Sequence, residues 1–239
     1  MKIFSLDSPL MQALNKVADL LWLNVLTLIC CLPIVTIGAS LTAMNYMALK
    51  IVRNEECYIT RGFFKSFREN FKQATIIWLG MLLLIVILVM DFIIMSGGTE
   101  TGFEKVLWGI IMAVALLVAA TMLYVFPVLA KFDNTVFRTV KNALMMSLMQ
   151  FPKTLIMLVV YAAPPVLFFT VAAAMPLCIL FGLSVPAWIS AKLYNKFFKK
   201  LEDQVLAANP PAEKEGGQEE DERIFKDELD PVLADKDTN

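Results

Sequence analysis

Long apolar runs constrain this chain more than any other feature of its sequence. Four of them follow one another, at Val17–Leu49, Ala74–Ser96, Val106–Ala130 and Thr154–Ala191. A helix needs about 20 apolar residues to cross a hydrocarbon layer of about 30 Å. Each run is long enough, and 58% of the chain is hydrophobic, whereas soluble proteins are about 45–50% apolar. The sequence therefore predicts an all-α protein, a polytopic transmembrane helical bundle.

The first run is too long for one crossing, because a single helix over it would measure about 50 Å. Pro33 and Gly38 lie in its middle and favour a break there. We expect a helix over residues 9–32 and a shorter one over 38–52. Whether residues 9–52 cross the membrane once or twice stays open.

The last run would measure about 57 Å as one helix, so it must fold back on itself. Pro164 and Pro165 are expected to kink its outgoing helix, and Pro176 is expected to begin the returning one. The predicted bundle then has five or six membrane helices. They form an integral membrane domain over residues 1–208.

Basic residues gather in three segments that the predicted spans place on the same side. Residues 50–72 hold six Lys or Arg, residues 131–153 hold four, and the segment after the last span opens with Lys192, Lys196, Lys199 and Lys200. Lys and Arg concentrate in cytoplasmic loops. We therefore expect a multi-pass protein of the plasma membrane with its basic loops in the cytoplasm. A cleaved signal peptide over residues 1–40 is the alternative, but it would export the basic loop at 50–72.

The C-terminal segment has a different composition. Residues 209–239 carry 4 Lys or Arg against 11 Asp or Glu, whereas residues 1–208 carry 17 against 11. A segment with few apolar residues and high net charge cannot bury enough surface to fold. We predict a disordered acidic cytoplasmic tail over 209–239.

The loop at residues 59–72 is predicted to form an amphipathic helix. Four phenylalanines fall on one helical face and four cations on the opposite face. The aromatic residues are Phe63, Phe64, Phe67 and Phe71, and the cations are Arg61, Lys65, Arg68 and Lys72. Such a helix is typical of the headgroup layer of a membrane. It is interpreted either as an interfacial anchor or as a docking surface for a partner protein.

A few polar residues interrupt the apolar runs. Asn24 and Asn45 lie within the first run, and Asp19 and Asp91 lie near the ends of predicted spans. Ionisable groups in a membrane often mark a transport path. Amides at this depth more often form hydrogen bonds between helices. Asn24, Asn45 and Asp91 are therefore candidate intramembrane polar sites, for either role.

The sequence lacks the residues and motifs that most often carry catalysis. The chain contains no histidine, which removes the commonest metal ligand and acid–base group. It has no phosphate-binding glycine loop, no serine-nucleophile elbow and no zinc-protease motif. We predict no enzyme activity, no metal, no cofactor and no nucleic-acid partner.

The first 80 residues resemble a known family. The shared elements are Asp7-Ser8-Pro9, Asn24, Leu32-Pro33, residues 36–40 (Thr-Ile-Gly-Ala-Ser) and residues 67–73. They are similar to the YesL-like family of bacterial integral membrane proteins. This resemblance implies a small multi-span protein, encoded beside carbohydrate-uptake transporters and glycan-degrading enzymes. The family has no assigned activity, so it implies no site residue.

Two functions are consistent with these features. The first is a non-catalytic accessory or assembly factor for carbohydrate uptake, which would bind the lipid bilayer and sugar ABC-transporter subunits. The alternative is a small homo-oligomeric transporter or channel for a small solute. The amphipathic loop favours the first, and the intramembrane polar residues favour the second.

Overall fold

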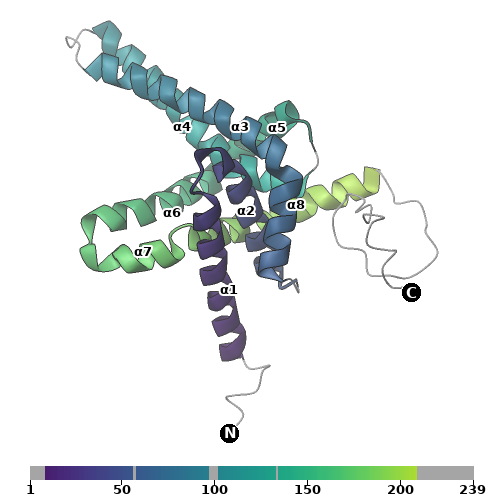
Figure 1. Cartoon of the computed structure of the whole chain (residues 1–239). Helices are drawn as coiled ribbons and strands as arrows, with labels where there is room; N and C mark the ends of the chain where they lie inside the picture. Colours follow the sequence, from purple (N-terminus) through teal and green to yellow (C-terminus); the bar gives the residue numbers. More distant parts are fainter. Residues whose placement is uncertain (1–8, 56–57, 97–101, 133, 209–239) are drawn as a thin grey trace. The chain divides into compact units, whose positions relative to one another are not determined.

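The computed structural model describes residues 9–55, 58–96, 102–132 and 134–208, and every regular element in these ranges is helical. Figure 1 shows their arrangement. The α-helices are α1 (Pro9–Cys30), α2 (Ile37–Arg53), α3 (Ile59–Ser96), α4 (Gly102–Lys131), α5 (Val136–Met149), α6 (Phe151–Thr170), α7 (Met175–Phe181) and α8 (Ser184–Ala208). Short 3-10 helices, η1 (Ile34–Thr36) and η2 (Ala172–Ala174), precede α2 and α7.

The predicted fold class is confirmed. Among the described residues, five helices are long and apolar enough to cross a membrane, and the bent pair α7 and α8 raises this number to six. The chain divides into two units, Met1–Lys196 and Phe197–Asn239. The packing described below concerns the first unit, and the predicted acidic tail at 209–239 lies outside the described residues.

The break in the first apolar run is also confirmed. Helix α1 ends at Cys30, close to the expected Leu32, and α2 begins at Ile37. Between them, the Thr36 hydroxyl donates to the carbonyl of Pro33 at 2.8 Å and to that of Cys30 at 2.5 Å. Pro33 cannot donate a backbone hydrogen bond, so the helix is interrupted there. The Thr36 side chain fixes the turn that results.

Helix α3 differs from the prediction. The loop helix expected at 59–72 is the beginning of α3, which runs without interruption from Ile59 to Ser96. No glycine or proline lies between Lys72 and the apolar run that starts at Ala74. Nothing therefore ends the first helix before the second begins, and the two join as one helix of about 57 Å.

Helix α2 packs closely on the first half of α3. A Cβ atom on Gly38 would lie 2.5 Å from the carbonyl oxygen of Ala74, and one on Gly62 would lie 2.7 Å from the sulfur of Met47. The Trp78 indole also donates to the carbonyl of Ile34 at 2.8 Å. These contacts set the two helices antiparallel, with backbones brought together by small residues as in many membrane interfaces.

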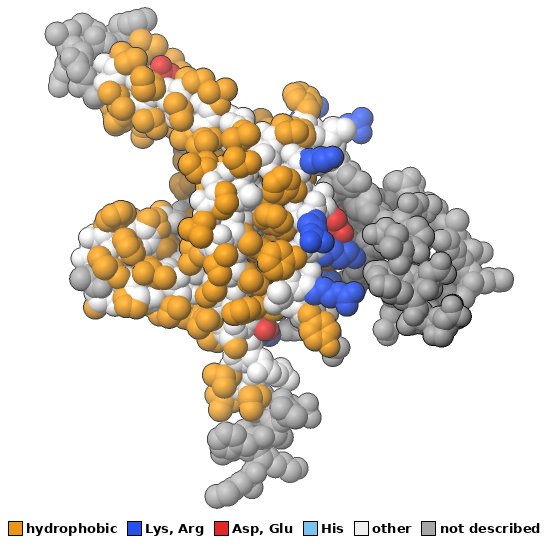
Figure 2. Space-filling view, in the orientation of Figure 1, with side chains coloured by type: hydrophobic (Ala, Val, Ile, Leu, Met, Phe, Trp, Pro, Cys, Tyr) orange, Lys and Arg blue, Asp and Glu red, His pale blue; other side chains and the backbone are white. Residues whose placement is uncertain are grey.

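The packed core lies where α2, the beginning of α3 and the end of α4 meet. Its largest fully buried side chains include Phe63, Met44, Met47 and Tyr124. By contrast, only 11% of the residues in the most apolar windows of α3, α4 and α6 are buried. In Figure 2 apolar side chains cover the α3–α4 and α6–α7 hairpins, whereas Lys and Arg gather toward the beginnings of α3 and α5. The hairpins therefore present the surface that lipid solvates.

Candidate functional site

The aromatic face of the predicted loop helix is partly buried in the protein. Phe63 is fully buried, Phe67 and Phe71 are half-buried, and Phe64 is exposed. The rings of Phe63 and Phe67 stack with centroids 6.3 Å apart, and those of Phe67 and Phe71 lie 5.6 Å apart. The amphipathic pattern was expected to face the headgroup layer. In the structure Phe63 packs inside the protein, next to Gly62, the residue whose backbone lies against Met47 of α2.

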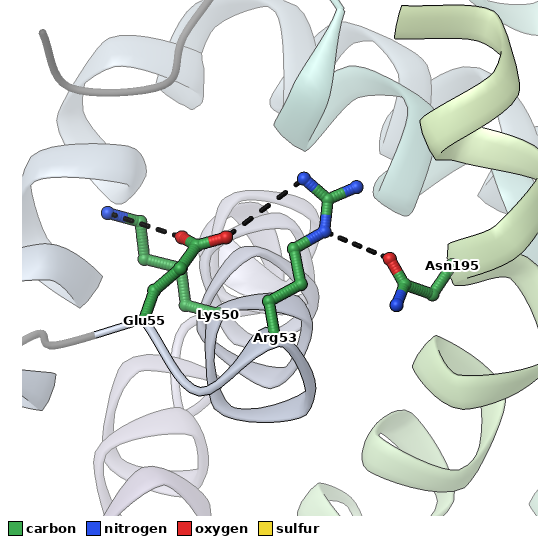
Figure 3. Close-up of polar contacts among 4 residues, drawn as sticks. All are labelled: Lys50, Arg53, Glu55 and Asn195. Carbon is green, nitrogen blue, oxygen red and sulfur yellow. Dashed lines mark hydrogen bonds and ion pairs between the residues drawn. The ribbon is translucent and has the colours of Figure 1, made fainter.

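The four cations of this segment lie on the outside of α3. We call Arg61, Lys65, Arg68 and Lys72 the cationic stripe, and all four are exposed. The basic residues at the end of α2 form contacts within the protein, as Figure 3 shows. There the largely buried Arg53 donates from Nε to Asn195 at 2.9 Å and lies 4.0 Å from Glu55, which also contacts Lys50 at 3.9 Å.

A shallow groove of about 830 Å³ runs between α1 and the start of α3. Three of its aromatic side chains are exposed: Trp22 at 48%, Tyr58 at 85% and Phe64 at 41%. The indole of Trp22 donates to the Thr60 hydroxyl at 2.9 Å, which holds the two helices together there. The groove is lined by Asp19, Trp22, Tyr58, Ile59, Thr60, Arg61 and Phe64.

The groove combines an acid, a base and three aromatic rings, and sequence reasoning found only part of it. Arg61 and Phe64 were in the predicted docking set, whereas Trp22, Tyr58 and Thr60 were not. Trp22 lies 38 residues from Thr60 in the chain, so no local pattern joins them. The exposed aromatic rings suit apolar contact with a partner, and the two charges suit orientation of its polar groups.

Asn24 is fully buried and forms a clamp on the break between α7 and α8. Its side-chain amide donates to the carbonyl of Ile179 at 2.8 Å. Its oxygen accepts from the backbone N–H groups of Leu183 and Ser184, both at 3.0 Å. Ile179 and Leu183 are four residues apart, the spacing of a helical hydrogen bond. The Asn24 side chain therefore replaces the direct hydrogen bond from Leu183 to Ile179. The two helices meet at an angle of 53°.

The other two polar candidates lie elsewhere. Asn45 is buried in α2, where its amide donates to Leu41 at 2.8 Å and its oxygen has no hydrogen-bond partner among the described residues. Asp91 is exposed near the end of α3. The structure does not bring Asp91 together with the asparagines into one site. No group of three or more Cys, Asp or Glu that could hold a metal ion occurs in the described part of the chain.

Comparison with known proteins gives one family match. Residues 19–92 match a family described as "Protein of unknown function, DUF624". No curated protein and no solved structure matches the chain. The matched stretch includes Asn24, Asn45, Asp91 and the cationic stripe, and the family assigns no activity to them. The finer resemblance to the YesL-like family stays a prediction.

Proposed function

We propose that this chain is a non-catalytic accessory or assembly protein for carbohydrate uptake in a bacterial plasma membrane, with its basic side in the cytoplasm. The groove between α1 and α3 is the observation that carries this proposal. It exposes Trp22, Tyr58 and Phe64 beside Arg61, and tryptophan, tyrosine and arginine dominate the binding energy of protein interfaces. The expected partner is a membrane subunit of a sugar ABC transporter. The link to sugars rests on the resemblance of the first 80 residues.

The arrangement of the spans supports an accessory role. Only 11% of the residues in the apolar windows of α3, α4 and α6 are buried within the protein, and the core lies at the basic end of α3. A transporter needs polar groups that line a path across the membrane. In this chain the exposed aromatic groove lies beside the start of α3, at the same end as the cationic stripe. Attachment to a partner at that end is the function that this geometry favours.

Changing Tyr58 and Phe64 together to aspartate should weaken partner binding at least tenfold while leaving the protein in the membrane. Both side chains are exposed, although the Phe64 ring also meets the buried Phe63 ring edge-on, with centroids 5.6 Å apart. Loss of two interface aromatics typically costs more than about 1 kcal/mol each, so recovery should fall at least tenfold. The measurement is affinity purification of the full chain from its native membrane in mild detergent, with bound proteins quantified by mass spectrometry.

Phe137→Asp is the matched control, because Phe137 is an exposed aromatic residue on α5, 78% accessible and outside the groove. It should leave the recovery of the partner unchanged. Phe67 and Phe71 are poor positions for this test, since both are half-buried in the aromatic stack. Equal recovery of a transporter subunit with wild type, the double aspartate variant and Phe137→Asp would rule out the groove as the docking site.

The second candidate is a small homo-oligomeric transporter or channel, and the break between α7 and α8 favours it. Transporters often bind substrates where a membrane helix is interrupted. Under the accessory proposal, purified protein in liposomes should move sugars, amino acids and ions no faster than protein-free vesicles do. A flux above that level, reduced by Asp91→Asn, would favour the transporter instead.

A further inference from the structure

The exposed face of α3 changes from cationic to apolar within one helical turn. The cationic stripe repeats at spacings of 3 and 4 residues, so its members share one face. The same spacing continues through Ile76 and Leu79 to Ile93, and these residues are exposed as well. One uninterrupted helix therefore exposes cations on its first turns and apolar side chains on the turns that follow. The change falls between Lys72 and Ile76.

The apolar part of this face has the length of one membrane crossing. From Ile76 to Ile93 the helix rises about 26 Å, close to the hydrocarbon thickness of about 30 Å. The turns before Ile76 then project from the membrane on the basic side. Helix α2 lies beside these turns, because Gly38 contacts Ala74 and Met47 contacts Gly62.

An alternative placement, in which α2 and the first half of α3 cross the membrane, is unfavourable. It would surround the first half of α3 with hydrocarbon and expose the cationic stripe to it. Charged side chains are the most costly ones to place at membrane depth. It would also leave the apolar face after Ile76 in water. Although α2 has the length and composition of a span, its position beside the stripe places it at the basic surface of the membrane.

We propose that Arg68 and Lys72 bind the phosphate groups of anionic phospholipids and so fix the depth of α3 in the bilayer. Lys72 lies about 6 Å from Ile76 along the helix, and Arg68 about 12 Å. The headgroup layer adds about 5–7 Å to each side of the hydrocarbon. Lys72 is therefore within that layer. Arg68 is within about one Debye length, 8 Å, of it.

The charge around the stripe supports an anionic ligand. Glu69 is the acidic residue of the segment 59–78, against the four cations of the stripe. Lys50 and Arg53 are occupied by Glu55 and Asn195 (Figure 3). Arginine binds phosphate through two parallel hydrogen bonds, and lysine acts as a point charge. Continuity with the lipid-facing part of α3 favours lipid phosphate over an acidic protein.

Two matched pairs of substitutions test this proposal. Arg68→Gln with Lys72→Gln removes two charges four residues apart near the membrane. Arg61→Gln with Lys65→Gln removes two charges at the same spacing on the same face, with Arg61 about 22 Å from Ile76. The full chain, purified in mild detergent, receives equal amounts of phosphatidylglycerol and phosphatidylcholine. Native mass spectrometry then gives the ratio of the two lipids retained.

Wild type should retain phosphatidylglycerol in preference to phosphatidylcholine. A cation near an anionic lipid surface contributes about fivefold in binding, so the first pair should lower the ratio by about 25-fold. The second pair should change it less than about threefold, because its charges lie mostly beyond screening distance. Arg68→Lys with Lys72→Arg should restore the preference. An equal loss with both pairs would indicate a diffuse surface for an acidic partner, and no loss with either would exclude headgroup binding; each result overturns the proposal.

Discussion

Replacing Gly38 with alanine should destabilise this protein by about 3 kcal/mol, at the upper end of the cost of overpacking a core. The added methyl group would lie 2.5 Å from the carbonyl oxygen of Ala74 and 2.7 Å from the Cβ of Trp78. Neither atom is the flexible end of a side chain, so α2 and α3 would have to move apart. The measurement is the free energy of unfolding in detergent micelles, from titration with a denaturing detergent.

Gly80→Ala provides the control for this prediction. Gly80 is also a helical glycine, in α3, and an added Cβ there would meet nothing within 4 Å. Alanine is the better helix former by about 1 kcal/mol, so this variant should be as stable as wild type or slightly more so. If Gly38→Ala were equally harmless, the close approach of α2 to α3 would be wrong. The placement of α2 beside the cationic stripe would then lose its support.

Much of the fold could be predicted because the breakers in this sequence act locally. Pro33 ended α1 where expected, and Pro176 lies in the first turn of α7. A proline removes a backbone donor and fixes φ whatever surrounds it. The continuity of residues 59–72 with the following span could also have been predicted, because no glycine or proline separates the two segments. The amphipathic pattern predicted a helix over 59–72 but did not show that it continues into the following span.

The candidate site was less predictable, because its parts are joined by contacts between distant residues. The pattern of Phe63, Phe67 and Phe71 showed that one face is apolar, but not that Phe63 alone is buried and the other two are half-buried. Trp22 joins the groove through Thr60, and Asn24 reaches residues more than 150 positions away. No local spacing encodes such pairings. The break after Gly182 did have a local signal in Pro186, since a proline interrupts the helical bond to the residue four positions before it.

Replacing Asn24 with leucine should cost about 3–5 kcal/mol, the second large effect expected. The change removes three hydrogen bonds and leaves the N–H groups of Leu183 and Ser184 without partners. A buried polar group without a partner costs about 1–3 kcal/mol. Unfolding in detergent measures the total, and hydrogen exchange at Leu183 and Ser184 should rise selectively. Thr27→Val is the control, because this buried hydroxyl bonds only the carbonyl of Leu23 in its own helix among the bonds described.

Pro186 gives this prediction a second test. Pro186 is one reason that α7 and α8 cannot form a continuous helix, so Asn24→Leu alone cannot be relieved by straightening. With Pro186→Ala added, Ile179 can accept the bond from Leu183 directly. The double variant should then be more stable than the sum of the two single changes predicts, by at least about 1 kcal/mol. Strict additivity would mean that Asn24 does not hold the break open, and the 53° bend would need another cause.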